Sequence, residues 1–145
     1  MKKTTILLAI VAFIFSVAFA GDVPGSIPAK LEQSFKKNFP AVTAVVWQQN
    51  DELNIAEFRQ NETKHLAYFD SNAKLVGVIR YITTEYIPLK TQNILKEKYS
   101  ELEKMNVLEV SVTNGEIYYL MNIMHNDKFT TIKVYTDGAI ETLNK

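Results

Sequence analysis

Residues 27–40 read IPAKLEQSFKKNFP, and this stretch decides the fold class expected for the chain. Its apolar residues recur every four positions, at Ile27, Leu31, Phe35 and Phe39, and the lysines and the glutamate lie off this stripe. Such spacing places the apolar side chains on one side of a helix. Pro28 suits the first turn, where the missing N–H is not needed, and Pro40 ends the helix. The stretch therefore predicts an amphipathic helix that packs on a sheet.

After Pro40 the apolar pattern changes to that of short strands. Four runs rich in β-branched and aromatic residues follow, at Val42–Gln48, Leu53–Arg59, Thr63–Phe69 and Lys74–Ile82. Polar turn residues separate them, and the last of these turns is Asp70-Ser71-Asn72-Ala73. Short strands joined by turns of this length predict an antiparallel meander.

The same order of elements begins again sixty residues later. Six residues repeat the character of the first helix at that offset: Ile87, Pro88, Lys90, Leu95, Lys96 and Tyr99. Strands are predicted at Asn106–Val112, Glu116–Met124 and Lys128–Tyr135, and the final turn spans residues 137–140. An internal duplication explains this order. We therefore expect repeat units at residues 21–84 and 85–145.

Each unit is so small that an isolated core would be marginal. The two units are therefore expected to form one α+β body, in which two helices cover one face of an antiparallel sheet. The other face of the sheet is expected to be open unless loops or a partner cover it.

Residues 1–20 have the layout of a cleavable signal peptide. Lys2 and Lys3 precede an apolar run, and Ala18-Phe19-Ala20 forms a small-x-small cleavage signal. The apolar run is shorter than the roughly twenty residues that span a bilayer, which argues against an uncleaved anchor. Removing twenty of the 145 residues leaves a mature chain of 125 with 14 basic and 16 acidic side chains. We expect a periplasmic or secreted protein with no membrane span after cleavage.

The composition excludes several classes of function. The whole chain carries 16 basic and 16 acidic residues and no cysteine. A neutral balance argues against nucleic acid as a partner, because phosphate binding needs a basic surplus. The lack of cysteine excludes disulfides, thiol catalysis, Cys-ligated zinc and a lipid anchor on cysteine.

The sequence shows no catalytic or metal-binding constellation. His65 and His125 each lack a second ligand at metal spacing. Asp70-Ser71-Asn72 begins like a calcium loop, but Ala73 and Lys74 follow where further oxygen ligands and glycine belong. No serine lies in a nucleophile elbow or an S-x-x-K motif. We therefore expect a protein that is not an enzyme and needs no cofactor or metal.

Several local features together resemble one family of secreted bacterial proteins. They are Phe39-Pro40, Val45-Val46-Trp47, Tyr68-Phe69-Asp70 before a turn, and Ile87-Pro88 at the second helix. With the signal peptide, this arrangement resembles the PepSY-like family, whose fold is similar to the beta-lactamase inhibitor protein. Ala73 departs from the family, which usually has glycine in this turn. The resemblance implies a tandem helix-and-sheet fold in the periplasm and no catalytic residues. Inhibition of a peptidase or lactamase is suggested by fold analogy alone.

Aromatic residues in the predicted strands are the candidate binding residues. Trp47, Tyr68, Tyr81 and Tyr118 combine apolar bulk with a polar group, as residues at binding surfaces often do. Tyr119 must face away from Tyr118, because neighbouring strand residues point to opposite faces. These side chains are either core packing residues or a recognition surface.

Two functional hypotheses follow. In the first, a non-catalytic periplasmic protein contacts another periplasmic or extracellular protein through the open sheet face and an exposed patch of tryptophan and tyrosine. In the second, a small-ligand carrier or enzyme accessory protein holds its ligand in a pocket between helices and sheet.

Overall fold

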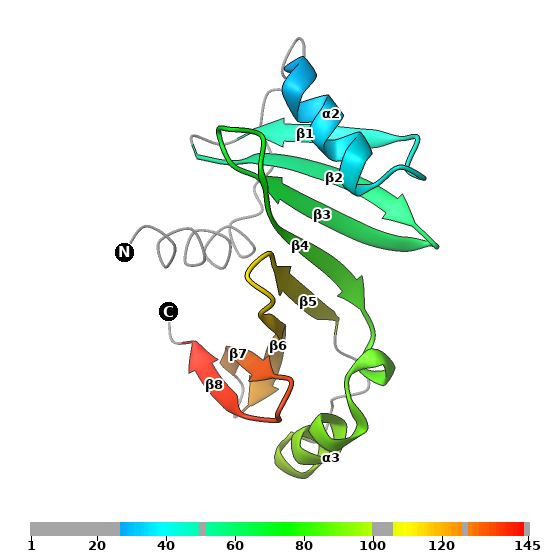
Figure 1. Cartoon of the computed structure of the whole chain (residues 1–145). Coiled ribbons are helices and arrows are strands. Elements are labelled where there is room, and N and C mark those ends of the chain that lie inside the picture. Colours follow the sequence, from blue (N-terminus) through cyan, green and yellow to red (C-terminus); the bar gives the residue numbers. More distant parts are fainter. Residues whose placement is uncertain (1–26, 50–51, 100–105, 126–127, 144–145) are drawn as a thin grey trace.

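In the computed structural model the described part of the chain consists of residues 27–49, 52–99, 106–125 and 128–143. The helical elements are α2 (Ala29–Asn38), the short 3₁₀ helix η1 (Thr84–Tyr86) and α3 (Leu89–Lys98). The strands are β1 (Val45–Gln49), β2 (Asn54–Gln60), β3 (Thr63–Phe69), β4 (Leu75–Ile82), β5 (Val107–Val112), β6 (Ile117–His125), β7 (Lys128–Tyr135) and β8 (Ile140–Leu143). They form a single antiparallel sheet in the order β1 to β8, which confirms the predicted α+β class (Figure 1).

Both predicted helices are present. Helix α2 directly follows Pro28, and Leu31 and Phe35 are its buried residues. It ends at Asn38, where the N–H of Phe39 donates to the carbonyl oxygen of Phe35 at 2.8 Å. Helix α3 likewise follows a proline, Pro88. The apolar stripe and the flanking prolines thus correctly located both helices.

The turn after β3 has a backbone conformation that is unusual for its residue. Ala73 has a φ of +63°, in the left-handed region that glycine adopts more easily. The Oδ1 atom of Asp70 accepts hydrogen bonds from the backbone N–H groups of Asn72 and Lys74, both at 2.9 Å. These bonds hold the turn in this conformation even though the residue is alanine.

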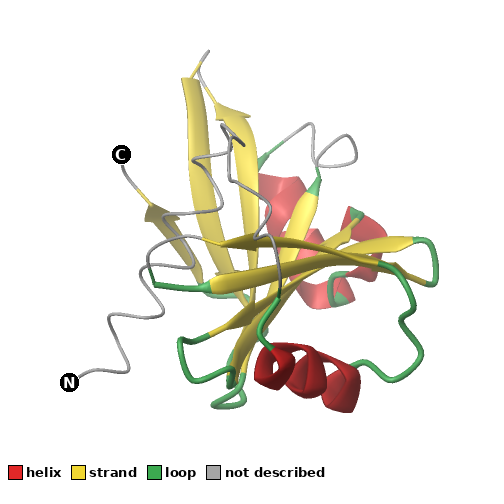
Figure 2. Cartoon of the chain, turned by 90° about the horizontal axis from the view of Figure 1, so that it is seen from above, coloured by secondary structure: helices red, strands yellow, loops and turns green. Residues whose placement is uncertain are grey.

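The strand register divides the side chains between two faces of the sheet. Trp47 pairs with Ala56 and Ala56 with Ala67, so these three residues share one face, which we call face A. Helix α2 packs on face A of the first four strands, and α3 packs on face A of the last four. Figures 1 and 2 show the helices near opposite ends of the sheet. Both helices therefore lie on one face, as predicted.

The core under α2 is aromatic. Phe35 lies between the rings of Trp47 and Phe58, with centroid distances of 5.5 and 5.3 Å. Phe69 completes the cluster from β3 at 5.9 Å from Trp47. Under α3 the core is mainly aliphatic, with Leu95 at its centre.

The opposite face of the sheet, face B, has a buried centre. Its cluster joins the two halves of the sheet and contains Leu53, Ile55, Leu66, Tyr68, Val76, Ile79, Val110, Tyr118 and Leu120. The sheet twists strongly between its halves (Figure 2), and large side chains from neighbouring strands lie against one another there. The centre of face B is therefore not open, because its own side chains cover one another there.

The order of one helix and four strands occurs twice along the chain. The units 21–84 and 85–145 stay an expectation, and η1 (Thr84–Tyr86) lies across the boundary expected between them. The duplication that would explain the order stays a prediction. The predicted signal peptide, residues 1–20, lies outside the described residues.

Candidate functional site

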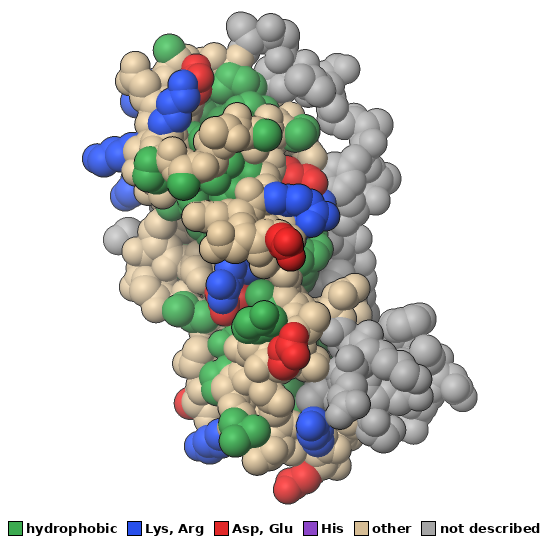
Figure 3. Space-filling model, turned by 90° about the vertical axis from the view of Figure 1, so that its right-hand side faces the viewer, with side chains coloured by type: hydrophobic (Ala, Val, Ile, Leu, Met, Phe, Trp, Pro, Cys, Tyr) green, Lys and Arg blue, Asp and Glu red, His purple; other side chains and the backbone are tan. Residues whose placement is uncertain are grey.

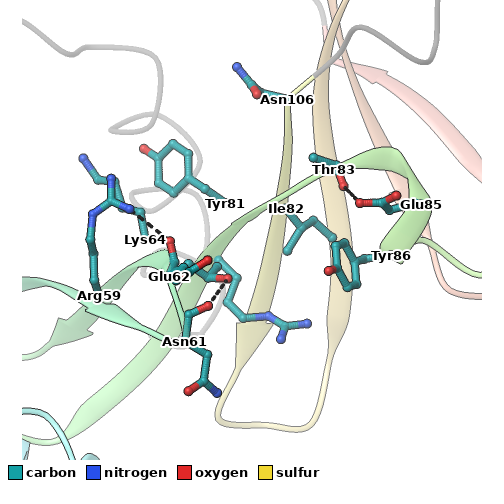
Figure 4. Close-up of a pocket in the computed structure, with 12 residues that line it drawn as sticks. Arg59, Asn61, Glu62, Lys64, Tyr81, Ile82, Thr83, Glu85, Tyr86 and Asn106 are labelled. Carbon is teal, nitrogen blue, oxygen red and sulfur yellow. Dashed lines mark hydrogen bonds between the residues drawn. The ribbon is translucent and has the colours of Figure 1, made fainter.

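A cleft of about 680 Å³ lies between the β2–β3 hairpin and η1, and we call it the hairpin cleft (Figure 4). Its lining residues come from both halves of the fold: Arg59, Asn61, Glu62, Thr63, Lys64, Arg80, Tyr81, Ile82, Thr83, Glu85, Tyr86 and Asn106. In Figure 1 the hairpin turn and η1 both lie on the right-hand side of the molecule.

The cleft forms where β3 and β4 diverge. Their paired register ends at His65 and Arg80, whereas β4 continues to Ile82 in its pairing with β5. Lys64 and Tyr81 would be the next pair, but they are not paired in the sheet. Beyond this point β2 and β3 are joined by the two-residue turn Asn61-Glu62, whose φ angles are +50° and +65°. The β2–β3 hairpin lines one side of the cleft, and the end of β4 with η1 lines the other.

The exposed aromatic residues gather at this cleft. Tyr81 is 37% exposed and Tyr86 is 66% exposed, and both line it. Tyr81 comes from the end of β4 and Tyr86 from η1, on different sides of the cleft in Figure 4. Tyrosine exposed in this way offers apolar area and a polar hydroxyl at little entropic cost, as at recognition surfaces.

Each of the three cations that line the cleft contacts a polar or aromatic group of the protein. Arg59 Nη1 donates to the carbonyl oxygen of Glu62 at 2.9 Å. Lys64 Nζ pairs with Glu57 at 2.8 Å and lies 5.3 Å from the centre of the Tyr81 ring. Arg80 donates from Nε and Nη2 to the two carboxylate oxygens of Glu109, both at 2.9 Å.

Two carboxylates also line the cleft, those of Glu62 and Glu85. The Glu85 carboxylate accepts a hydrogen bond from the Thr83 hydroxyl at 2.7 Å. Figure 3 views this side of the molecule and shows basic, acidic and hydrophobic side chains interspersed. The lining therefore has donors, acceptors and aromatic rings together, which suits recognition more than acid–base chemistry.

The structure does not bring the four predicted aromatic residues into one exposed surface. Trp47 is only 7% exposed and packs under α2 on face A. Tyr68 and Tyr118 lie on face B and are buried. Only Tyr81 is exposed, at the cleft. Trp47 is therefore corrected to a core position, on the face opposite the three tyrosines.

Burial of Tyr118 has a specific cause. Lys133 Nζ lies 4.0 Å from the centre of the Tyr118 ring and 4.5 Å from that of Tyr135, and it pairs with Glu116 at 3.2 Å. The lysine thus covers the ring on face B by a cation–π contact. Burial, together with the nearby Glu116 carboxylate, raises the pKa of Tyr118 to about 12. Burial also raises the pKa of Tyr68.

Sequence reasoning missed most of the cleft. Of the residues that line it, only Tyr81 is among the candidate binding residues predicted from the sequence. The one available signal was Tyr86, an aromatic residue in the connection before Pro88. The other residues become neighbours only through the divergence of two strands.

The described residues contain no group of three metal-ligating side chains. His65 is buried in β3, stacked on Phe58 at a centroid distance of 5.1 Å. Its Nδ1–H donates to the carbonyl oxygen of Thr63 at 2.9 Å. His125 is the last residue of β6.

His65 makes stability depend on pH. Burial lowers its pKa below 6.5, the positive charge of Arg80 lowers it further, and the Thr63 hydrogen bond and Glu109 oppose this. The folded state then binds fewer protons than the unfolded state just below pH 6.5. We expect the free energy of unfolding to rise with pH from the folded-state pKa of His65 up to about 6.5.

Urea unfolding at several pH values measures this dependence. The His65→Gln variant, which does not titrate, should show a flatter slope between pH 5 and 7. An identical slope in both proteins would assign the dependence to other groups.

Comparison with known proteins places the fold in the BLIP-like class. A structure of a BLIP-like protein from Bacteroides fragilis matches with a TM-score of 0.62 and 16% identity, over 83% of this chain and 86% of that chain. Two further neighbours are also Bacteroides proteins. A DUF2874 family protein from Bacteroides uniformis matches with a TM-score of 0.72 and 21% identity, over 79% and 86% of the two chains. A protein from Bacteroides eggerthii, provisionally assigned to the periplasm, matches with a TM-score of 0.69 and 18% identity, over 81% and 90%.

No family model matches the chain, and no curated protein matches it. The PepSY-like assignment is thus not confirmed, whereas the BLIP-like fold is supported by the solved structures. Among the described residues, neither helix is long and apolar enough to cross a membrane.

Proposed function

We propose that this is a non-catalytic periplasmic binding protein that recognises another protein through the hairpin cleft. The observation that carries the proposal is the gathering of Tyr81 and Tyr86, both exposed, with Arg59 and Arg80 around one concave site. Tyrosine and arginine are the residues most enriched at the energetic centres of protein interfaces. The predicted signal peptide and a fold neighbour provisionally assigned to the periplasm support the compartment.

The proposed recognition surface is the hairpin cleft, not the aromatic sheet face predicted from the sequence. Tyr81 is retained from the sequence prediction, and Tyr86 takes the place of the buried aromatic residues. The non-catalytic assignment is supported by the charged lining residues, since Lys64 and Arg80 are paired with carboxylates. Inhibition of an enzyme is one form that such binding takes, and the BLIP-like fold alone does not select it.

The small-ligand hypothesis expected a pocket between helices and sheet. Those interfaces are packed by Phe35 and Trp47 under α2 and by Leu95 and Ile132 under α3. The hairpin cleft lies elsewhere, although its volume falls within the range of about 300–1,000 Å³ typical of ligand sites. A small ligand would therefore also bind at the cleft.

Capture of partners from periplasmic extract tests the proposal. The Tyr81→Ala/Tyr86→Ala variant should lose at least about tenfold in recovery of the partner, since each interface anchor of this type contributes about 2 kcal/mol. Ile117→Ala is the matched control, because Ile117 is also exposed but does not line the cleft.

Equal recovery by the double variant and the wild type would contradict recognition through the cleft. Turnover of any substrate by the purified protein would contradict the non-catalytic assignment.

A further inference from the structure

We infer that the partner protein binds through an uncharged apolar side chain, which the tyrosines of the hairpin cleft and the neighbouring Leu89 receive; this inference rests on the proposed function. Leu89 is 71% exposed and Tyr86 is 66% exposed, the highest values among the large hydrophobic residues of the described chain. Three steps of about 3.8 Å between Cα atoms link the two residues, so these Cα atoms lie within about 11 Å of each other. The apolar surface at the cleft therefore continues onto the first residue of α3.

The fold does not require a large apolar residue at either position. Thr91, a buried residue of α3, lies about 200° around the helix axis from Leu89. Leu89 is thus on the solvent side of the helix and does not pack in the core. Sixty residues earlier, the corresponding positions before and at the start of the first helix hold Ser26 and Ala29. Small residues are sufficient at such positions, so the exposed apolar area of Tyr86 and Leu89 indicates a contact surface.

The charges around the cleft are balanced within the protein. Three cations and four carboxylates lie at or beside it: Arg59, Lys64, Arg80, Glu57, Glu62, Glu85 and Glu109. Lys64 pairs with Glu57 at 2.8 Å. Arg80 and Glu109 share two hydrogen bonds of 2.9 Å. No cationic or anionic surplus attracts a charged group of the partner, and burying one would desolvate it without a free counter-ion. An uncharged side chain avoids this cost.

The tyrosine rings determine where the apolar side chain would lie. Tyr81 extends from β4 and Tyr86 from η1, on different sides of the cleft in Figure 4. Hydrogen bonds fix η1, because Gln92 Nε2 donates to the carbonyl oxygens of Glu85 and Ile87 at 3.3 and 2.8 Å. Little conformational entropy is then lost when a side chain packs against the rings. An aromatic or branched aliphatic side chain gives the largest contact with such rings.

Titration of the ¹⁵N-labelled protein with three defined peptides tests this inference. The first is acetyl-Ser-Phe-Ser-Leu-Ser-amide, and the other two carry glutamate or lysine in place of phenylalanine. The phenylalanine peptide should shift the amide signals of Thr83, Tyr86 and Leu89. It should bind at least about tenfold more tightly than either charged peptide, because burial of the aromatic side chain provides most of the affinity. High salt should change its affinity by less than about twofold, since no ion pair forms.

Three variants assign the contact. Leu89→Ala should weaken binding of the phenylalanine peptide at least about threefold, through loss of apolar contact area. Ile117→Ala is its matched control and should bind like the wild type, because Ile117 is 43% exposed but does not line the cleft. Arg59→Gln should also leave the affinity unchanged, because the arginine charge is not used. The amide spectrum of each variant shows directly whether it is folded.

Equal affinity for the three peptides, tighter binding of a charged peptide, or wild-type affinity of the Leu89→Ala variant would overturn the inference. If no peptide shifts these signals at millimolar concentration but the Tyr81→Ala/Tyr86→Ala variant still loses its partner, the proposed function stands and the apolar contact is wrong. If the double variant keeps its partner, the proposed function itself fails.

Discussion

Replacing Phe35 by alanine is expected to lower the free energy of unfolding by about 4 kcal/mol. Phe35 is 3% exposed, and its ring contacts those of Phe39, Trp47 and Phe58 at centroid distances between 5.2 and 5.5 Å. Truncation removes these contacts and leaves a cavity among rigid rings that cannot collapse to fill it. Urea denaturation followed by tryptophan fluorescence measures the change, because Trp47 lies in the same cluster.

Lys37→Ala is the control for this prediction, since Lys37 is exposed on the same helix. Its effect should stay within about 0.5 kcal/mol. A loss below about 1 kcal/mol for Phe35→Ala would show that α2 does not pack on the sheet as described.

Replacing Leu95 by alanine is expected to cost about 3 kcal/mol. Leu95 is a fully buried residue of α3, and it packs in the cluster that contains Val107, Ile132 and Val134. The change deletes three carbon atoms from an aliphatic core and creates a cavity there. Glu97→Ala, at an exposed position of α3, is the matched control.

The number of unfolding transitions of the Leu95→Ala variant also tests whether the two halves of the fold share a core. The face B cluster joins strands of both halves, and β4 pairs directly with β5. We therefore expect one cooperative transition, in which Leu95→Ala and Phe35→Ala each lower the same midpoint when Trp47 fluorescence and far-UV circular dichroism are followed. Two separate transitions, with Trp47 insensitive to Leu95→Ala, would show that the halves unfold independently.

The secondary structure was predictable because its causes are local. The four-residue spacing of Leu31 and Phe35 and the proline before each helix depend only on nearby residues. Strands β3 and β7 have the predicted bounds, and the other predicted strands agree within a few residues. The turn at Ala73 was also located, although its left-handed φ follows from hydrogen bonds that Asp70 makes within the turn.

The candidate site was less predictable because it depends on register and on divergence between strands. Alternation alone separates Tyr118 from Tyr119, but it does not say which of them faces a helix. A shift of one residue in the pairing of β1 with β2 would move Trp47 to the other face. The observed pairing of Trp47 with Ala56 instead places it under α2.

By itself the sequence determined where both α-helices and the strands β1 to β7 lie and that they form an α+β body, because spacing and turn chemistry are properties of neighbouring residues. It did not predict β8, which begins at Ile140 in the expected final turn. Only the tertiary structure decided which aromatic residues are core and which are exposed. Tyr118 is buried because it packs in the face B cluster and because Lys133, from the next strand, covers its ring. Tyr81 and Tyr86 share a cleft because β3 and β4 separate after His65 and Arg80. Both outcomes depend on contacts between segments whose relative positions are set by packing of the whole sheet.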